Sequence, residues 1–195
     1  MAAYAYVADP NSWLDPFGLA RKKGGCGAVS SPYRKGYDKA SIAAIPKLKR
    51  PKNPNKYLKK RYVDRHLEQF HGEASYLVTG QTYENRIVGA AEIGRPDGQF
   101  LSTKTDIDAV LSRANGDVSV IEKEIGIPDG QWQNQKGIYR IDVQNPETLN
   151  LRLPNGREGG ANVLWEPGGL LPGGSAEAVV NQIPAGRFKA TKVVP

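Results

Sequence analysis

The sequence predicts an α+β fold in which strands occur in clusters and helices are few. Short apolar segments follow one another without a regular alternation of strand and helix, so a parallel βαβ sheet is excluded. The chain has 195 residues, of which 22 are glycine and 14 are proline, and this composition indicates many turns and loops. Hydrophobic residues make up 39% of the chain, which is enough for a substantial core at this length.

Six segments carry the short, β-rich pattern expected of strands. The first two, residues 75–79 and 99–103, are separated by the turn sequence Gly-Arg-Pro-Asp-Gly at 94–98. The segment at 137–143 alternates apolar and polar residues, as a half-buried strand does. Three further strands are expected at 148–153, 177–182 and 186–194.

Helices are expected at three places. Residues 56–70 place Tyr57, Tyr62, Leu67 and Phe70 on an apolar stripe among lysines and arginines. Thr105 is expected to cap a helix that runs to residue 114, with Asp108 three residues further on. Ser119 with Glu122 indicates a short helix that ends at Gly126. The glycine- and proline-rich stretch 156–174, which contains Trp165, is expected to be a long loop.

The charge is distributed unevenly along the chain. Residues 1–72 contain 15 Lys and Arg against 5 Asp and Glu, whereas residues 73–195 contain 12 against 15. We therefore expect a basic linker and helix at 21–72, with most of 21–55 extended or mobile, followed by a nearly neutral domain at 73–195. The basic segment is either a solvated linker or a surface that contacts phosphates. Tyrosines that could stack on bases lie among its charges: Tyr33, Tyr37, Tyr57 and Tyr62.

Several classes of protein are excluded by composition. A single cysteine, Cys26, cannot form an internal disulfide, and with only His66 and His71 beside it a zinc site is not expected. No apolar stretch approaches the roughly 20 residues of a membrane span, and residues 1–20 lack the continuous apolar region of a signal peptide. The sequence also contains no P-loop, no dinucleotide glycine fingerprint and no Gly-x-Ser-x-Gly elbow. Neither a metal nor a membrane is expected to take part.

The first 20 residues contain turn formers and aromatic residues in a specific order. Tyr-Ala-Tyr-Val at 4–7 is followed by Asp-Pro-Asn-Ser-Trp at 9–13 and by Asp-Pro-Phe-Gly-Leu at 15–19. This order resembles the closing segment of the Rhs/YD-repeat core, after which a variable toxin domain begins in polymorphic toxins. The resemblance implies a border at residues 1–20, export by a type VI or similar system, and action in the target-cell cytoplasm. It also implies the Rhs core of a parent chain and a cognate immunity protein, which we expect to be acidic because the toxin is basic.

A second resemblance rests on three segments of the remaining chain. Gln-Phe-Leu-Ser-Thr at 99–103, Gly-Gly-Ser-Ala-Glu-Ala-Val-Val at 173–180 and Ile-Pro-Ala-Gly-Arg-Phe-Lys at 183–189 resemble motifs of the ADP-ribosyltransferase superfamily. The resemblance implies two small, mostly antiparallel sheets that form an NAD cleft, with a few peripheral helices. It also implies that Glu177 is the catalytic glutamate, that Ser102 and Thr103 brace the nicotinamide pocket, and that Tyr76 holds the place of the first motif's residue.

The chemistry of NAD cleavage is consistent with one carboxylate. Breaking the bond between nicotinamide and ribose creates an oxocarbenium-like centre and releases a neutral base, so one glutamate that counters the charge can suffice. We expect aromatic faces to hold the cationic nicotinamide, and arginines to hold the diphosphate; the candidates are Tyr76, Phe100, Trp165, Arg95 and Arg140. Ser175 occupies the position where the superfamily commonly has the Glu or Gln that orients a protein acceptor. With the basic segment, this favours RNA over protein as the acceptor.

Three alternatives remain open at this point. Water could accept the ADP-ribose, which would make the protein an NAD glycohydrolase. A metal-free ribonuclease could use His66 and His71, because paired histidines are its minimal acid–base apparatus. The basic segment could also bind nucleic acid without any catalysis, in which case affinity would fall steeply with salt.

Overall fold

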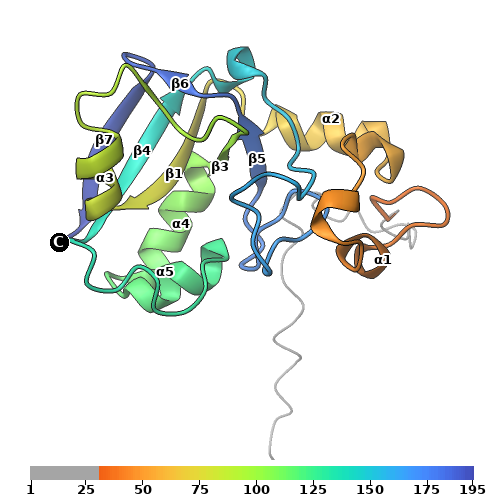
Figure 1. Ribbon diagram of the computed structural model, residues 1–195, viewed down its shortest axis with the longest axis horizontal. Helices are drawn as coiled ribbons and strands as arrows, with labels where there is room; N and C mark the ends of the chain where they lie inside the picture. The colour runs from red at the N-terminus through yellow and green to blue at the C-terminus, as the bar shows by residue number, and fades with distance from the viewer. Residues whose placement is uncertain (1–30) are drawn as a thin grey trace, which may run out of the picture. The chain divides into compact units, whose positions relative to one another are not determined.

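A five-stranded antiparallel sheet organises residues 31–195, the part of the chain that the computed structural model describes (Figure 1). Its strands follow the order β5-β3-β1-β4-β7, and β2 pairs with β6 in a separate two-stranded sheet. The α+β expectation is thus confirmed, while the border segment 1–20 lies outside the described residues. The strand bounds are β1 Glu73–Thr79, β2 Glu92–Ile93, β3 Gln99–Thr103, β4 Ile138–Gln144, β5 Glu177–Val180, β6 Ile183–Pro184 and β7 Phe188–Val194.

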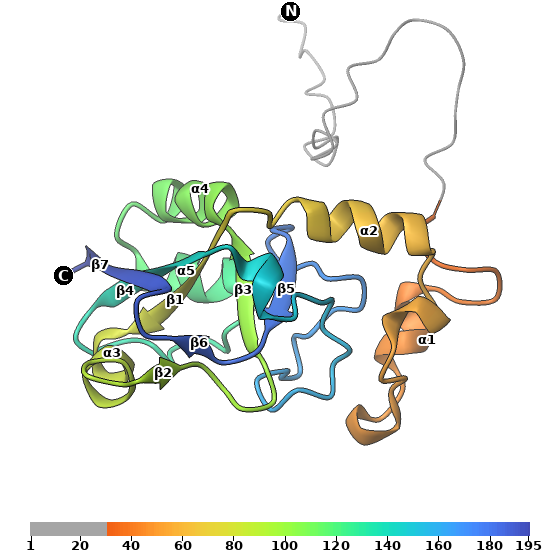
Figure 2. The same ribbon diagram turned by 90° about the horizontal axis from the view of Figure 1, so that it is seen from above.

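The sheet is covered on both faces (Figure 2). Helices α4 (Lys104–Ala114) and α5 (Val118–Ile125) cover one face, where Leu77 and Ile138 of the sheet meet Ile107 of α4. Helix α3 (Gly80–Arg86) and the two-stranded sheet lie on the other face, over a second core that contains Ile141. Alternate residues of each strand therefore enter different cores, as the two-residue period of a strand requires.

The basic segment is folded within the described residues. It contains α1 (Lys39–Ala43), the 3₁₀ turns η1 (Lys47–Lys49) and η2 (Pro54–Lys56), and α2 (Lys60–Glu68). The expectation of an extended or mobile chain is therefore wrong for residues 31–55. The physical reason is a third core, in which apolar side chains spaced among the lysines bury against the long loop: Ile42, Tyr57, Leu58, Val63, Leu153, Ala161 and Trp165. These residues belong to the same compact unit as the sheet.

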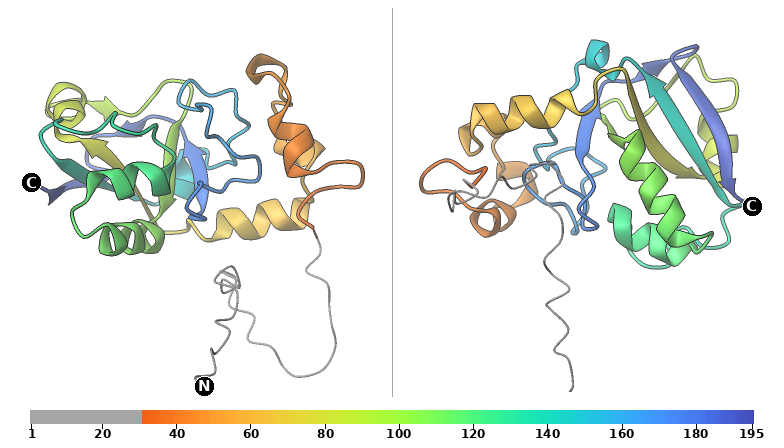
Figure 3. Two further views of the ribbon diagram at one scale, coloured as in Figure 1. Left: turned by 90° about the horizontal axis from the view of Figure 1, so that it is seen from below. Right: turned by 180° about the vertical axis from the view of Figure 1, so that it is seen from behind.

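This segment lies beside the β5 edge of the sheet, with the loop 150–175 between them (Figure 3). Several polar contacts join the two segments. The Lys39 ammonium pairs with Glu166 at 2.6 Å, and the Arg50 guanidinium donates to the Gly156 carbonyl at 2.8 Å while stacking on the Trp165 ring. The long loop is therefore held between the sheet and the amino-terminal helices.

Local details differ from the sequence prediction at several element ends. Thr103, not Thr105, caps α4, because the Thr103 hydroxyl accepts from the Asp106 N–H at 3.0 Å. Asp117, not Ser119, caps α5, whereas Gly126 ends that helix as expected. Only part of the strand expected at 148–153 is present. Residues 148 and 149 belong to η3 (Pro146–Leu149), and Asn150 adopts a left-handed backbone conformation that interrupts extended chain. Arg152 then forms an isolated antiparallel bridge with Val179 of β5.

Candidate functional site

A cavity of about 180 Å³ opens where two neighbouring strands separate. β1 and β4 form seven residue pairs, but β1 and β3 form only two, Ala74 with Thr103 and Ser75 with Ser102. Beyond those pairs, residues of both strands line the cavity, among them Tyr76 and Leu101. The cavity does not lie between the two sheets, as the cleft expectation had it, because none of its lining residues belongs to β2 or β6. Its other walls are the loops after α5 and before β5.

Glu177, the first residue of β5, lies in this cavity with its side chain largely removed from solvent. It is 8% exposed, and among residues 31–195 no side chain or backbone group forms a hydrogen bond or ion pair with its carboxyl. Burial raises the pKa of this carboxyl to about 8, and the negative charges of Glu158 and Glu166 act in the same direction. The Glu177 carboxyl therefore holds a proton and faces the cavity without a hydrogen-bond partner from the part of the chain that the structure describes.

Ser102 and Thr103 have different environments. Ser102 lies directly opposite Glu177 in the β3–β5 pair and lines the cavity, so the serine and the glutamate share a face of the sheet. Thr103 is not among the lining residues, because adjacent strand residues point to opposite faces and its hydroxyl caps α4. The structure brings only one hydroxyl of the expected pair to the carboxyl.

The aromatic candidates all border the cavity. Tyr76, Phe100 and Trp165 line it, and burial raises the Tyr76 pKa, which keeps the phenol neutral. Trp132, which was not expected at the site, also lines the cavity. Its place in a glycine-rich connection without periodicity offered no signal.

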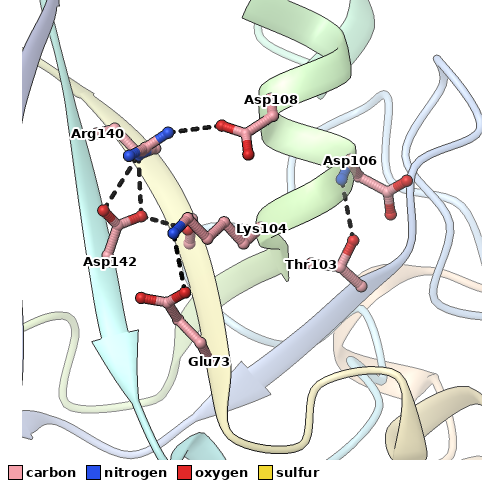
Figure 4. Close-up of polar contacts among 8 residues, drawn as sticks. Glu73, Thr103, Lys104, Asp106, Asp108, Arg140 and Asp142 are labelled. Atoms are coloured by element: carbon pink, nitrogen blue, oxygen red, sulfur yellow. Dashed lines mark hydrogen bonds and ion pairs between the residues drawn. The ribbon is translucent and has the colours of Figure 1, made fainter.

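The two arginine candidates lie elsewhere. Arg140 is not among the lining residues; its guanidinium pairs with Asp108 of α4 at 2.6 Å and with Asp142 of β4 at 2.9 Å (Figure 4). Arg95 pairs with Asp97 at 3.4 Å and lies against Gly159 and Gly160, of which Gly160 lines the cavity. Arg95 is thus near the rim, and no lysine or arginine is among the residues that line this cavity.

A row of polar residues continues from the cavity across the sheet. Ser75 lies opposite Ser102 on one side and opposite Asp142 on the other, and the Ser75 hydroxyl donates to the Asp142 carboxylate at 2.6 Å. Beside this row, Lys104 of α4 pairs with Glu73 at 3.0 Å (Figure 4). Five charged side chains are thus paired with one another, and none of the five lines the cavity: Glu73, Lys104, Asp108, Arg140 and Asp142.

Two carboxylates hold the loops that form walls of the cavity. The fully buried Glu122 of α5 accepts hydrogen bonds from the backbone N–H groups of Gly130 at 2.9 Å and Trp132 at 2.5 Å. The Asp106 carboxylate accepts from the Ala176 N–H at 2.9 Å, one residue before Glu177. The sequence analysis gave neither carboxylate a role, since a helix-surface acid has the same pattern.

The two histidines are not brought together as an acid–base pair. His66 is 1% exposed, its Nε2 lies 3.0 Å from the Glu177 carbonyl oxygen, and burial lowers its pKa. His71 is an exposed residue beyond the end of α2, and its Nε2 lies 3.8 Å from Glu147. The geometry therefore gives the ribonuclease alternative no shared site.

Among residues 31–195, no group of three or more His, Cys, Asp and Glu side chains is arranged to hold a metal ion. Within that range, no helix has the length and apolar character to span a bilayer. Comparison of the chain with protein-family models, curated proteins and solved structures found no match to any of them.

Proposed function

We propose that the protein is an antibacterial effector toxin that transfers ADP-ribose from NAD to a macromolecular acceptor. The observation that carries the proposal is the buried Glu177 carboxyl directly opposite Ser102, which has no hydrogen-bond partner within residues 31–195 and faces a cavity that four aromatic residues line. A carboxyl without a protein partner suits a ligand that brings positive charge. Among common biological substrates, the nicotinamide–ribose half of NAD combines a flat aromatic cation with a bond whose cleavage develops further positive charge on the sugar.

The electrostatics support a cationic ligand. With its pKa near 8, Glu177 holds a proton at neutral pH while the cavity is empty. A pyridinium ring beside it favours the ionised form, because an opposite charge within a few ångströms lowers a carboxyl pKa. Glu166, which also lines the cavity, adds negative potential of the same sign. Aromatic faces such as Trp165 add attraction for the cation.

In the proposed reaction, the bond between the ribose C1′ and the nicotinamide nitrogen breaks, and its electron pair neutralises the ring nitrogen. The ionised Glu177 carboxylate stabilises the positive ribosyl centre. A nucleophilic oxygen or nitrogen of the acceptor then bonds to C1′ and releases its proton to solvent. Ser102, next to the carboxylate, supplies a hydroxyl that can donate to it. Arg95 at the rim is the arginine in the best position to meet the diphosphate.

RNA is the acceptor that the surface charge favours. Exposed basic side chains of the 31–65 segment include Arg34, Lys35, Lys49, Lys52, Lys56, Arg61 and Arg65. The segment also contacts the cavity wall directly, because Lys47 donates to the Ala161 carbonyl at 2.6 Å and Lys39 pairs with Glu166. A phosphate backbone on this surface would approach the loop that borders the site.

Delivery and self-protection are part of the same proposal. The Rhs-like border at residues 1–20 supports export within a parent chain and release in the cytoplasm of a competing cell. The producer then requires a cognate immunity protein, for which an acidic surface would complement the basic segment. Native mass spectrometry with the product of the neighbouring reading frame tests this; no complex between the two would contradict it.

The decisive experiment incubates the chain with labelled NAD and a total bacterial lysate, followed by nuclease or protease digestion of the product. We expect label in RNA with the unmodified chain and none with Glu177→Gln, while Glu92→Gln, an exposed carboxyl on β2, should behave like the unmodified chain. Label that protease alone removes would identify a protein acceptor. Loss of NAD without labelled macromolecules would identify a glycohydrolase.

The same assay separates the remaining alternatives. Shortened RNA without any requirement for NAD, with full toxicity of Glu177→Gln, would identify a ribonuclease and refute the proposal. Intact NAD and intact RNA, with salt-sensitive RNA binding, would indicate a binding protein without catalysis.

A further inference from the structure

Three aromatic side chains of the basic segment contact backbone carbonyls of Glu177 and of the loop that precedes it. The Tyr33 hydroxyl donates to the Pro167 carbonyl at 2.8 Å, and the Tyr62 hydroxyl donates to the Gly168 carbonyl at 2.7 Å. His66 Nε2 lies 3.0 Å from the carbonyl of Glu177 itself. We name Tyr33, Tyr62 and His66 the aromatic clamp.

The next carbonyl in the loop completes the arrangement. The Gly169 carbonyl accepts from the Glu177 N–H at 2.7 Å, so three successive carbonyls, 167 to 169, each have a donor. The N–H and C=O of one strand residue point to the same side, and both groups of Glu177 are bonded away from β3. Glu177 and Ser102 are therefore a non-hydrogen-bonded cross-strand pair, the kind in which side chains lie closer together.

The contact between Nε2 and the Glu177 carbonyl identifies the tautomer of His66. A carbonyl can only accept, so the neutral ring must hold its proton on Nε2 and leave Nδ1 bare. Nδ1 is buried without a partner, so a second proton there would be a buried charge with no acceptor. The ring is packed between Tyr62 and Phe70, with centroids 5.8 Å and 5.7 Å away. His66 is thus held as a fixed neutral donor and does not line the cavity.

The loop passes close to Leu153 and His66 at Gly169. Gly169 has a φ of 74°, and a Cβ on it would lie 2.2 Å from Leu153 Cδ2 and 2.9 Å from His66 Nε2. Burial raises the pKa of Tyr33 to about 12 and also raises that of Tyr62, so both hydroxyls keep their protons as donors. Glycine is therefore the residue that lets the loop approach the histidine.

We infer that His66 is a positioning residue for Glu177, and that the aromatic clamp makes the amino-terminal basic segment an integral part of the site. The effect of His66 on the reaction rests on the proposed function. The aromatic clamp is a set of hydrogen bonds to the backbone and does not depend on that function. His66 fixes the Glu177 carbonyl, Gly169 fixes its N–H, and Ser102 opposes it across the sheet. Together they set the direction in which the carboxyl enters the cavity.

The test compares His66→Phe, which keeps an aromatic ring but no donor, with His66→Gln, whose side-chain N–H can reach the carbonyl. We expect His66→Phe to lower kcat for NAD consumption about tenfold or more, with KM for NAD unchanged, and His66→Gln to recover kcat to within about threefold. His71→Phe and His71→Gln, at the exposed histidine, should match the unmodified chain. Equal kcat in His66→Phe and the unmodified chain would overturn the inference.

Two measurements do not depend on catalysis. Nitrogen NMR of the 195-residue chain at pH 7 should find His66 neutral with its proton on Nε2, and a proton on Nδ1 would overturn the clamp. Hydrogen exchange of the Glu177 amide should accelerate at least tenfold in His66→Phe and stay near the unmodified rate in His66→Gln; no acceleration would also overturn it. If the unmodified chain consumes no NAD, the proposed function fails, and these two measurements still decide the clamp.

Discussion

Ser102 of β3 lies directly opposite Glu177 of β5, and Ser75 of β1 lies opposite Ser102 on the other side. The three side chains therefore follow one another across one face of the sheet, at the place where β1 and β3 separate. Of these three residues, Glu177 and Ser102 line the cavity, whereas the Ser75 hydroxyl donates to Asp142. The candidate site therefore places the Ser102 hydroxyl next to the Glu177 carboxyl.

Ser102→Ala and Thr103→Val should separate catalysis from stability. Ser102 donates to no protein group in the described residues, so its loss should lower kcat about tenfold with little change in the free energy of unfolding. Thr103 caps α4, so its loss should lower the free energy of unfolding by about 1 kcal/mol and leave kcat nearly unchanged. Steady-state kinetics and chemical denaturation of both variants check this, and the reverse pattern would contradict the assignment.

The activity should rise with pH. The proposed reaction requires the ionised form of Glu177, and the pKa of this carboxyl is about 8 in the empty cavity. We expect kcat/KM for NAD to increase about tenfold per pH unit below that value and to level off above it, since kcat/KM reports the free protein. Glu92→Gln should follow the same profile. A kcat/KM that is flat between pH 6 and 9, values within about two units of that pKa, would exclude Glu177 as the group that must ionise.

The stability of the unliganded protein should change with pH in the opposite direction. Glu177 ionises near its ordinary 4.5 in the unfolded chain and near 8 in the folded one, so between these values the folded state binds one more proton. Its contribution is present at low pH and is lost as pH rises, by about 1.4 kcal/mol per unit at most. Denaturation from pH 5 to 8 should therefore show Glu177→Gln gaining relative to the unmodified chain. A constant difference would refute the raised pKa.

The sheet was predictable where side chains alternate, and the order of three short segments predicted that Ser102 and Glu177 lie near each other. Segments 75–79, 99–103 and 177–182 contain β1, β3 and β5 almost in full, and their order placed Glu177 with Ser102. The same alternation would have separated Ser102 from Thr103 and paired Arg140 with Asp142, because residues one apart face opposite ways and residues two apart share a face. Those two errors were avoidable.

The aromatic clamp and the third core were not predictable in this way. Tyr33 and Tyr62 donate to backbone carbonyls more than 100 residues away. Every residue has a backbone carbonyl, so the residue type does not indicate which one accepts a hydrogen bond. Glycines 168 and 169 indicated a loop but not what it approaches. The strand expected at 148–153 is interrupted for a local reason, since Asn150 in a left-handed conformation redirects the chain before Arg152 bridges to β5. Long-range contacts, not local propensity, decided the aromatic clamp and the third core.

Tryptophan fluorescence should report ligand binding. Trp132 and Trp165 both line the cavity, and Trp13 lies outside the described residues. In a Trp13→Phe background, NAD should quench emission in a saturable way, because a cationic nicotinamide ring stacked on an indole accepts an electron from the excited indole. A further Trp165→Phe change should remove part of the quenching and weaken binding through loss of the aromatic face. Emission unchanged at millimolar NAD, the upper end of typical KM values, would argue against binding in this cavity.

Glu122→Gln tests whether the loop after α5 shapes the cavity. The carboxylate of this fully buried residue accepts from two backbone N–H groups, those of Gly130 and Trp132. Glutamine has one acceptor oxygen, so one N–H group would face a side-chain N–H and lose its partner, at a cost of about 1–3 kcal/mol in the free energy of unfolding. The loop should loosen around Trp132, which raises KM for NAD several-fold while kcat changes less, because Glu177 and Ser102 are held by other contacts. Glu124→Gln, on the same helix but paired with Arg113 at the surface, is the matched control and should change KM little. An unchanged KM in Glu122→Gln, together with reduced stability, would mean that this loop contributes to folding but not to the binding of NAD.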